Sequence, residues 1–595
     1  MPAGYDRNMW LVRDDRRTRR RPHAAVAVAC ALALAMLAGC GGSSSPGTSA
    51  DPAGVVPAGA PIYIGAIVRP AGSLQTETLA AGRALTGKSD PFGRLVSVLQ
   101  TPGAPALDYD HDVAPWLGPN AGMFITSLGS ASSIEGLLEQ GLGAGASGSA
   151  QTGAWPFGPG GAKGAIVLDT SDLKSAESFV AQEAAHVNAH SRSYRGVSYQ
   201  ASSDGDAFAV VKRFVVLGSE AAVQAVIDTA QGGAPLTSNT TYGRLVSVAP
   251  SDALGHVYAS AAATLAGAAI NASHPGLPSL LGTLAGTSPL NASLVPAAGS
   301  LALDADVGAQ AGRAAHTPSG LVRAAAKGGP AFRALPGNSW LAAGLGEGAS
   351  AGSNLRALQG VLSYASTLGG QAAAEAAASP QVTLSVRGLI EGVLAPLKAL
   401  TERGRSATSW MRDAAIFASG TTVLELKAAI TIDSSSAAAA RAAVASMATA
   451  LHGQGAEATP TTISGTEAAV EAKVSGLPVT LAIAAGRGAG GQPKLVIGVS
   501  STSVQDALHP ASTMASSSAL TSAQSALGAG VTPSMSVNVV SLTGLLEGIG
   551  LGEDPTIAPF ASYLHGSTQL SGGGATPAPG IERLRVVLGL KPASG

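Results

Sequence analysis

The chain has 595 residues, of which 12% are charged and 46% are hydrophobic, and its formal net charge is −1. A charge this close to zero removes the electrostatic basis for nucleic-acid binding, and the hydrophobic content is too high for a mainly disordered chain. The 2 cysteines are too few for a disulfide scaffold or for a zinc site built from several cysteines.

The first 39 residues have the pattern of a lipoprotein signal peptide. Five arginines between positions 16 and 21 precede 15 uncharged, mostly apolar residues at 24–38. That run is short for a membrane span but has the length of a signal-peptide core. It ends in Leu37, Ala38, Gly39 and Cys40, which resembles the bacterial lipobox, whose cysteine is diacylated and becomes the mature N-terminus. An ordinary secretory signal followed by a chance cysteine is the alternative.

The lipobox implies where the protein resides. Cys40 would carry the lipid that attaches the mature chain to the membrane, which places the protein outside the cytoplasm. The Gly/Ser/Pro-rich residues 40–54 are expected to be a flexible tether. Cys30 lies inside the removed signal, so the folded part would contain no thiol for catalysis or metal binding. Seven arginines and three acidic residues leave with residues 1–39, which gives the mature chain a net charge of −5.

The first half of the mature chain alternates strand and helix patterns. The predicted strands are residues 61–68, 121–128, 164–169, 197–201, 207–211, 213–217 and 256–260. The predicted helices are residues 74–85, 173–190, 220–230 and 242–248, with Ser171 or Asp172 as the N-cap of the second. Residues 203–206 are expected to form a hairpin turn.

The same order of patterns recurs in the second half. Residues 56–63 parallel residues 334–341, and residues 164–180 parallel residues 423–444. Residues 214–228 and 495–508 share an apolar strand, a glycine, a serine cap and a helix containing Val-Gln. We therefore predict an α+β protein with two tandem related modules, at 55–325 and 330–591, each a mainly antiparallel sheet covered by helices.

Four segments resemble an uncharacterised family of bacterial envelope proteins, known as a domain of unknown function. They are VPAGAPIYIGA (56–66), DVAPWLG (112–118), LDTSDLKSAESFV (168–180) and FVVLGSEAAVQAVID (214–228). The resemblance covers residues 55–330, whereas the second half matches only in its order of patterns, with Trp410 near the position of the Pro-Trp-Leu-Gly signature. The family implies a location in the cell envelope, and it implies no reaction, cofactor or catalytic residue.

Two motifs match nucleotide-binding or hydrolase patterns. Residues 82–89 fit the P-loop pattern, but a predicted helix rather than a strand leads into them. Residues 348–352 fit the nucleophile elbow of serine hydrolases, with Ser350 as the nucleophile after a predicted strand at 340–345. Candidate partners that follow in the required order are Asp433, Asp506, His509 and His565. A chance match in a chain rich in Gly, Ala and Ser is the alternative.

Two further patterns suggest metal or ligand sites. His186 and His190 are four residues apart on a predicted helix, a spacing that could bind a metal, and Asp108, Asp110 and Asp112 form an acidic cluster. The alternatives are histidines that favour a helix C-terminus and a solvated turn. Residues 92–98 and 242–248 are nearly identical, so Arg94 and Arg244 are either a repeated ligand site or solvated residues of two similar helix starts.

We expect a lipid-anchored extracytoplasmic protein that binds or scaffolds an envelope protein and is not an enzyme. No metal and no cofactor is expected. The first alternative is a carrier of an apolar ligand such as a lipid, suggested by the mean hydropathy of +0.27 and the few charges. The second alternative is a serine hydrolase that uses Ser350.

Overall fold

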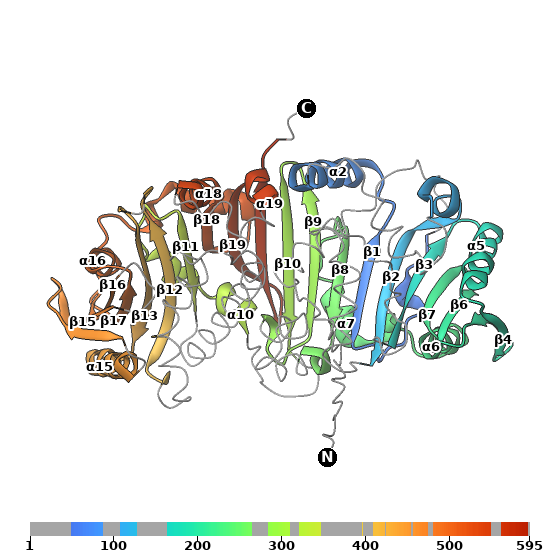
Figure 1. Ribbon diagram of the computed structural model, residues 1–595, viewed down its shortest axis with the longest axis horizontal. Helices are drawn as coiled ribbons and strands as arrows, with labels where there is room; N and C mark the ends of the chain where they lie inside the picture. Colours follow the sequence, from blue (N-terminus) through green and yellow to red (C-terminus); the bar gives the residue numbers. More distant parts are fainter. Residues whose placement is uncertain are drawn as a thin grey trace, which may run out of the picture.

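The described residues form one long antiparallel sheet of 20 strands with helices packed around it (Figure 1). The computed structural model describes residues 49–86, 107–127, 163–264, 284–309, 320–346, 396, 408–422, 424–453, 456–473, 480–548 and 561–592. The predicted α+β class and the antiparallel pairing are confirmed. The prediction of a separate sheet for each module is wrong, because β10 and β20 pair along nine residue pairs and join all the described strands into one sheet.

The first ten strands form one half of the sheet, blue to green in Figure 1. From the outer end to the middle, their order is β4-β5-β6-β7-β3-β2-β1-β8-β9-β10. They are β1 (Ile62–Ile67), β2 (Leu117–Ser127), β3 (Lys163–Thr170), β4 (His190–Tyr194), β5 (Val197–Ala201), β6 (Asp206–Val211), β7 (Phe214–Ser219), β8 (Gly255–Ala259), β9 (Leu290–Ala297) and β10 (Ser300–Gly308).

The second ten strands continue the sheet on the other side of β10, yellow to red in Figure 1. From the middle outward, their order is β20-β19-β18-β11-β12-β13-β17-β16-β15-β14. They are β11 (Leu341–Leu345), β12 (Met411–Ser419), β13 (Lys427–Ser434), β14 (Glu457–Pro460), β15 (Thr466–Lys473), β16 (Thr480–Arg487), β17 (Pro493–Gly498), β18 (Thr532–Asn538), β19 (Ser567–Ala578) and β20 (Ile581–Leu590).

Helices cover the sheet along its length. They are α2 (Gly72–Thr86), α5 (Leu173–His186), α6 (Glu220–Ala230), α7 (Thr240–Val246), α10 (Leu321–Ala326), α11 (Gly329–Arg333), α15 (Ala437–Gly453), α16 (Ser501–Leu508), α17 (Ser518–Leu527), α18 (Val539–Gly548) and α19 (Ala561–Gly566), with short turns η1 (Pro52–Gly54), η2 (Tyr109–Val113), η3 (Leu236–Ser238) and η5 (Met514–Ser516). Within the described parts of the chain, no helix combines the length and the apolar character needed to cross a bilayer.

The core of the first half lies on both faces of the sheet. Alternate residues of β3 point to opposite faces, so Leu168 packs in the cluster that contains Phe179 of α5, while Val167 packs in the cluster that contains Ile227 of α6. In the second half, α15 and α16 take the corresponding places over two further clusters. Strands buried on both faces read as continuous apolar runs, which explains why they were identifiable from sequence.

The turn between β5 and β6 and the start of α6 agree with the sequence predictions. The Ser202 N–H donates to the Asp206 carbonyl (2.8 Å), and Gly205 between them adopts φ +90°, a backbone conformation that glycine accepts without steric cost. Ser219 is the N-cap residue of α6, which spans the predicted residues 220–230.

The predicted helix through residue 190 is too long. Helix α5 ends at His186, and Asn188 takes a left-handed conformation with φ +52°, which terminates the helix. His190 then begins the edge strand β4. His186 and His190 therefore do not share a helix face, and the spacing argument for a metal site is wrong.

The N-terminal part of the described chain is packed rather than free. Residues 50–54 were expected to belong to a flexible tether. Instead, the Asp51 side chain caps η1 by accepting from the Ala53 N–H (2.9 Å), and Pro52 and Ala53 are buried against the sheet. The remainder of the predicted tether, 40–48, lies outside the described residues.

Candidate functional site

The Asp-Val-Ala-Pro-Trp-Leu-Gly segment at 112–118 forms the turn that begins β2. Asp108 accepts from the His111 N–H (2.9 Å) and caps η2, while Asp112 accepts from the Asp108 N–H (2.8 Å). The Trp116 indole N–H donates to the Asp112 carbonyl (2.8 Å). The acidic cluster at 108–112 thus stabilises its own turn through local hydrogen bonds.

Trp116 joins this turn to the start of helix α5. Its carbonyl accepts from the Ser171 N–H and from the Thr170 hydroxyl, both at 2.8 Å. Its ring, 1% exposed, lies 4.8 Å from the Phe179 ring of α5, measured between centroids. Asp172 rather than Ser171 caps α5, because its carboxylate accepts from the N–H groups of the first turn. The hydrogen bond from the Ser175 hydroxyl, together with these backbone bonds, lowers the pKa of Asp172.

An arginine after β1 holds the same turn from the other side. The Arg69 guanidinium donates to the Leu117 carbonyl (2.7 Å) and to the Ala114 carbonyl (3.2 Å). A charged donor on carbonyls that lie outside a regular ladder satisfies groups that would otherwise be costly to bury. The Asp-Val-Ala-Pro-Trp-Leu-Gly segment, one of the four that carried the family resemblance, therefore forms a structural turn between β1, β2 and α5.

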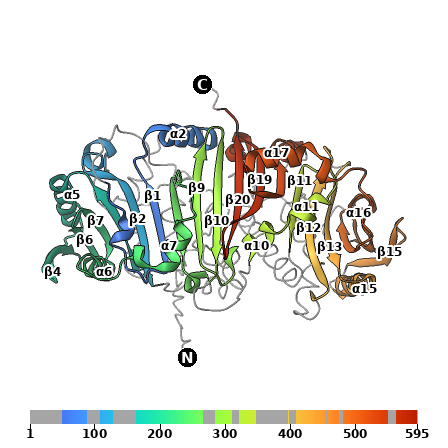
Figure 2. The same cartoon turned by 180° about the vertical axis from the view of Figure 1, so that it is seen from behind.

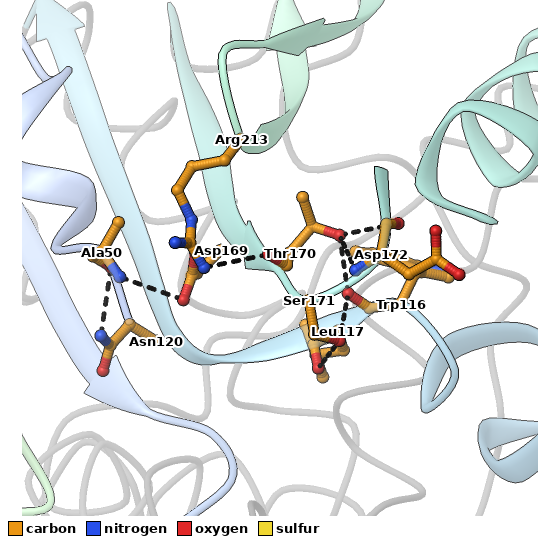
Figure 3. Close-up of polar contacts among 9 residues, drawn as sticks. All are labelled: Ala50, Trp116, Leu117, Asn120, Asp169, Thr170, Ser171, Asp172 and Arg213. Atoms are coloured by element: carbon orange, nitrogen blue, oxygen red, sulfur yellow. Dashed lines mark hydrogen bonds and ion pairs between the residues drawn. The ribbon is translucent and has the colours of Figure 1, made fainter. Parts of the chain in front are cut away.

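Next to this turn, the carboxylate of Asp169 binds the N-terminal segment (Figure 3). Asp169, near the end of β3, has no exposed surface and accepts from the Arg213 Nε (2.8 Å) and from the Ala50 N–H (3.3 Å). The Asn120 side-chain amide of β2 donates to the Ala50 carbonyl (3.1 Å). Gly118 makes room for this arrangement, since a Cβ there would lie 2.7 Å from the Asp169 carboxylate.

We call these residues, Ala50, Trp116, Asn120, Asp169, Thr170 and Arg213, the clasp. Burial raises the pKa of Asp169, and the donors Ala50 and Arg213 oppose that shift. Its oxygens are directed at protein donors, so the clasp is suited to holding a chain segment rather than to transferring a proton to a substrate. The segment that it holds follows Cys40 by ten residues, a length of chain that spans at most about 35 Å.

The second half has a related arrangement, in which no N-terminal segment takes part among the residues that the structure describes. Asp433 of β13 pairs with Lys494 of β17 (2.6 Å), and the Trp410 carbonyl accepts from the Ser435 N–H (2.8 Å). Ser436 accepts from the Ala439 N–H at the start of α15 (3.2 Å), as Asp172 does for α5. Asp433 is 27% exposed, whereas Asp169 is fully buried.

Several predicted site residues lie outside the described residues. They are Cys30, Cys40, Arg94, Ser350 and the P-loop residues Gly87, Lys88 and Ser89. The described part of the P-loop match belongs to helix α2, as the sequence predicted. Arg244 at the end of α7 reaches the Pro579 carbonyl of the β19–β20 turn (3.4 Å).

Three of the four candidate partners of Ser350 take part in other interactions. Asp433 is paired with Lys494, Asp506 with Lys427 (2.8 Å), and His565 with Glu547 (2.7 Å). Within the described ranges, no group of three His, Cys, Asp or Glu side chains converges as a metal site would require.

The sequence patterns did not predict that Asp169, Arg213 and Asn120 form a cluster. A signal was present, because Asp169 interrupts an apolar strand that is buried on both faces, and a buried carboxylate requires a partner. Arg213 begins the apolar strand predicted at 213–217, which the structure places beside β3. The sequence alone did not indicate that Ala50 completes the cluster.

A second polar cluster, Tyr63, Tyr242, Tyr258 and His256, lies between β1, β8 and α7. The Tyr242 hydroxyl lies 3.2 Å from the His256 Nε2, and the Tyr63 and His256 ring centroids are 5.7 Å apart. Burial lowers the pKa of His256 and raises the pKa values of Tyr63, Tyr242 and Tyr258.

His256 predicts a loss of stability in mild acid. Because burial lowers its pKa below the unfolded value of about 6.5, the unfolded chain binds the proton in preference. The free energy of unfolding should therefore fall as the pH drops below 6.5, by at most about 1.4 kcal/mol per pH unit for this one proton. Urea unfolding between pH 7.5 and 5 should show a shallower decline for His256→Gln than for the wild type.

The difference between variant and wild type isolates His256 from other groups. Burial raises the pKa values of Asp169, Asp206 and Asp306, so those carboxyls act in the opposite direction on acidification, equally in both proteins. His452, exposed near the end of α15, provides the control variant His452→Gln. An unchanged decline in His256→Gln would contradict the assignment.

Comparisons with known proteins identify a family but no activity. A family model described as "Protein of unknown function (DUF3352)" matches residues 24–529, which extends the resemblance into the second half of the chain. A comparison with curated proteins gave no significant match.

Solved structures give only weak similarity. Crystal form I of TP0453 is 10% identical over 45% of this chain and 82% of that chain, with a TM-score of 0.24. Crystal form III of the same protein is 11% identical over 45% and 83%, with a TM-score of 0.23. Similarity at this level supports no inference about fold or function.

Proposed function

We propose that this chain, which belongs to the DUF3352 family of proteins of unknown function, is a lipoprotein attached to the cell membrane outside the cytoplasm through Cys40. Its role would be to bind or scaffold envelope proteins without catalysis. The observation that carries the proposal is the clasp, in which Asp169 and Asn120 hold the backbone of Ala50. A chain anchored at residue 40 is thereby connected to a rigid sheet at residue 50.

The N-terminal pattern supports the anchoring. The basic residues, the short apolar run and the cysteine after Gly39 occur together in the first 40 residues. Two acyl chains on one cysteine are sufficient for stable attachment, whereas a single chain is marginal. The short distance between Cys40 and the clasp would keep the sheet within about 35 Å of the bilayer surface.

The pairing of the charged groups supports a role without catalysis. Asp169, Asp433 and Asp506 each form an ion pair with a basic side chain. A catalytic acid or base needs a proton position open to a substrate, and carboxylates held by protein donors lack one. A binding or scaffolding role requires only a stable surface.

We also propose that the two halves arose by internal duplication. When both halves are read from the outer end to the middle, the strand order of the second half is that of the first with each strand number raised by ten. The Leu236 N–H donates to the Val56 carbonyl (2.7 Å), and the Met514 N–H donates in the same way to the Leu335 carbonyl (2.7 Å). These equivalent hydrogen bonds make Val56 the structural counterpart of Leu335, whereas the sequence comparison had aligned Val56 with the preceding residue, Ala334.

The lipid anchor is tested by substitution of Cys40. We expect Cys40→Ser to move the protein from the membrane fraction to the soluble extracytoplasmic fraction, because no acyl chain can be attached to the hydroxyl by the thioether chemistry of the lipobox. Cell fractionation with detergent extraction, followed by immunoblotting, measures the distribution.

The second cysteine provides the control. Cys30→Ser lies in the predicted signal core and should leave the mature protein in the membrane fraction. Membrane retention of Cys40→Ser after high-salt washing would contradict the proposal, since attachment would then depend on another part of the chain.

A further inference from the structure

The joint between the two halves is the pairing of β10 with β20. Nine residue pairs run from Ser300 opposite Gly589 to Gly308 opposite Ile581, and the central pair is Asp304 opposite Arg585. Figure 2 shows the two strands side by side in the middle of the sheet. The halves are joined here by residues about 281 positions apart, so this ladder determines how they assemble.

The two strands of the joint are equivalent elements of their halves. β9 and β10 are connected through Gly299 (φ +72°), and β19 and β20 through Gly580 (φ +75°). The Leu590 N–H donates to the Gly299 carbonyl (2.8 Å), and the Ala309 N–H donates to the Gly580 carbonyl (3.0 Å). These reciprocal bonds match Gly299 with Gly580 and describe a pseudo-twofold axis through the joint.

Asp304 and Arg585 lie on that axis. Each is the fifth residue after its turn glycine, so they occupy equivalent positions and face each other in the ladder. Two hydrogen bonds of 2.7 Å join the Arg585 guanidinium to both oxygens of Asp304. Asp304 has no exposed surface, and the Arg585 side chain is 27% exposed.

A second ion pair lies beside the axis. Arg583 donates to both oxygens of Asp306, at 2.7 and 2.8 Å. The positions equivalent to Asp306 and Arg583 are Val587 and Ala302, so this pair does not lie opposite its own equivalent. The Arg583 guanidinium also donates to the Val248 carbonyl after α7, and Arg585 to the Leu527 carbonyl at the end of α17.

We propose that the Asp304–Arg585 pair makes the edge of each half an interaction surface for the unlike half and excludes pairing of like halves between two copies of the chain. If two β10 strands paired about the same axis, Asp304 would face Asp304. If two β20 strands paired, Arg585 would face Arg585. Like charges directly opposite in a buried ladder are strongly unfavourable, whereas Asp306 would face only Ala302 in such a pair.

This inference rests on the equivalence of the two halves and does not depend on the lipid anchor. The experiment uses the full chain with Cys40→Ser in every variant, so that the protein can be studied in solution. Asp304→Arg and Arg585→Asp each place like charges opposite on the axis. We expect each to lower the folded-to-unfolded ratio at least about 100-fold in urea titrations.

The swap Asp304→Arg/Arg585→Asp restores opposite charges and should recover at least half of the loss, measured as the urea midpoint. Recovery is expected to be incomplete because Arg583 also lies 3.6 Å from Asp304. The swap Asp306→Arg/Arg583→Asp reverses the neighbouring ion pair beside the axis, and its urea midpoint is compared with that of the swap on the axis. A swap on the axis no more stable than its single variants would overturn the proposal.

The decisive test mixes the two single variants. One chain then has arginine at positions 304 and 585, and the other has aspartate at both. Unfolding the two together in urea and refolding them should give a dimer of twice the chain mass, because only an assembly of one copy of each places unlike charges opposite at every joint. Light scattering after size exclusion measures the mass.

Refolded alone, neither single variant should form that dimer. The mixture of Asp306→Arg with Arg583→Asp, beside the axis, is the comparison. Exchange of unlike halves also brings its opposite charges together, whereas pairing of like halves would place position 306 opposite Ala302, so this mixture should dimerise through unlike halves alone. A mixture of Asp304→Arg and Arg585→Asp that behaves as the sum of its components would overturn the proposal. Variants that fail to refold alone but refold as a pair would support it.

Discussion

Replacing Trp116 by alanine is expected to destabilise the protein by about 3–5 kcal/mol, the usual cost of removing a large buried aromatic side chain. The indole is 1% exposed, stacks on Phe179 and donates to the Asp112 carbonyl. Its loss would leave a cavity between the turn at 108–118 and helix α5, as well as an unpaired carbonyl. Chemical unfolding followed by far-UV circular dichroism, which reports on the backbone, measures the change in the free energy of unfolding.

The second half supplies a matched control for Trp116. Trp410 takes a related place before β12, where its carbonyl accepts from the Ser435 N–H, but its side chain is only half-buried. Trp410→Ala should therefore cost clearly less than Trp116→Ala. Equal losses in the two variants would contradict the view that the signature turn is a packing element specific to the first half.

Replacing Asp169 by alanine should cost about 2–3 kcal/mol and also release the N-terminal segment. The variant leaves the Arg213 guanidinium without its carboxylate and the Ala50 N–H without its acceptor, and breaking one side of a buried pair is more costly than the pair's net contribution. Arg213 is 33% exposed, so water compensates part of the loss. Limited proteolysis should cut the segment before residue 55 faster in this variant.

Asp433→Ala is the matched control for the clasp. Its partner Lys494 is also left unpaired, but no N-terminal segment contacts Asp433 within the described residues, so stability should fall without faster cleavage before residue 55. If both variants expose the N-terminus equally, the segment is not held by Asp169, and the clasp loses its proposed role.

Local patterns predicted much of the fold. Helix α6 and strands β5, β6 and β7 agree with the sequence because their apolar periodicity, glycine turn and serine N-cap all act within a few residues. The end of α5 was missed because the apolar pattern continues past the point where Asn188 turns left-handed. Asparagine often adopts the left-handed conformation at the end of a helix, so Asn188 did indicate a helix end. The apolar periodicity that continued past it indicated a longer helix.

Long-range pairing could not be predicted in the same way. The single sheet depends on β10 and β20, whose partners are about 281 residues apart, and no local pattern encodes such a contact. The alternating Asp304, Asp306 and Arg583, Arg585 in otherwise apolar strands were the available clue, because buried charges need opposite charges. The clasp could not be predicted for the same reason, since it joins Ala50 to Asp169, which are 119 residues apart in the sequence.

The mass of the mature N-terminus tests the central claim most directly. Mass spectrometry of the protein purified from the membrane fraction should show a chain that begins at Cys40 and carries a diacylglyceryl group, with or without a further acyl chain on its amine. A mature N-terminus at another residue, or an unmodified Cys40 in the membrane-bound protein, would contradict the account.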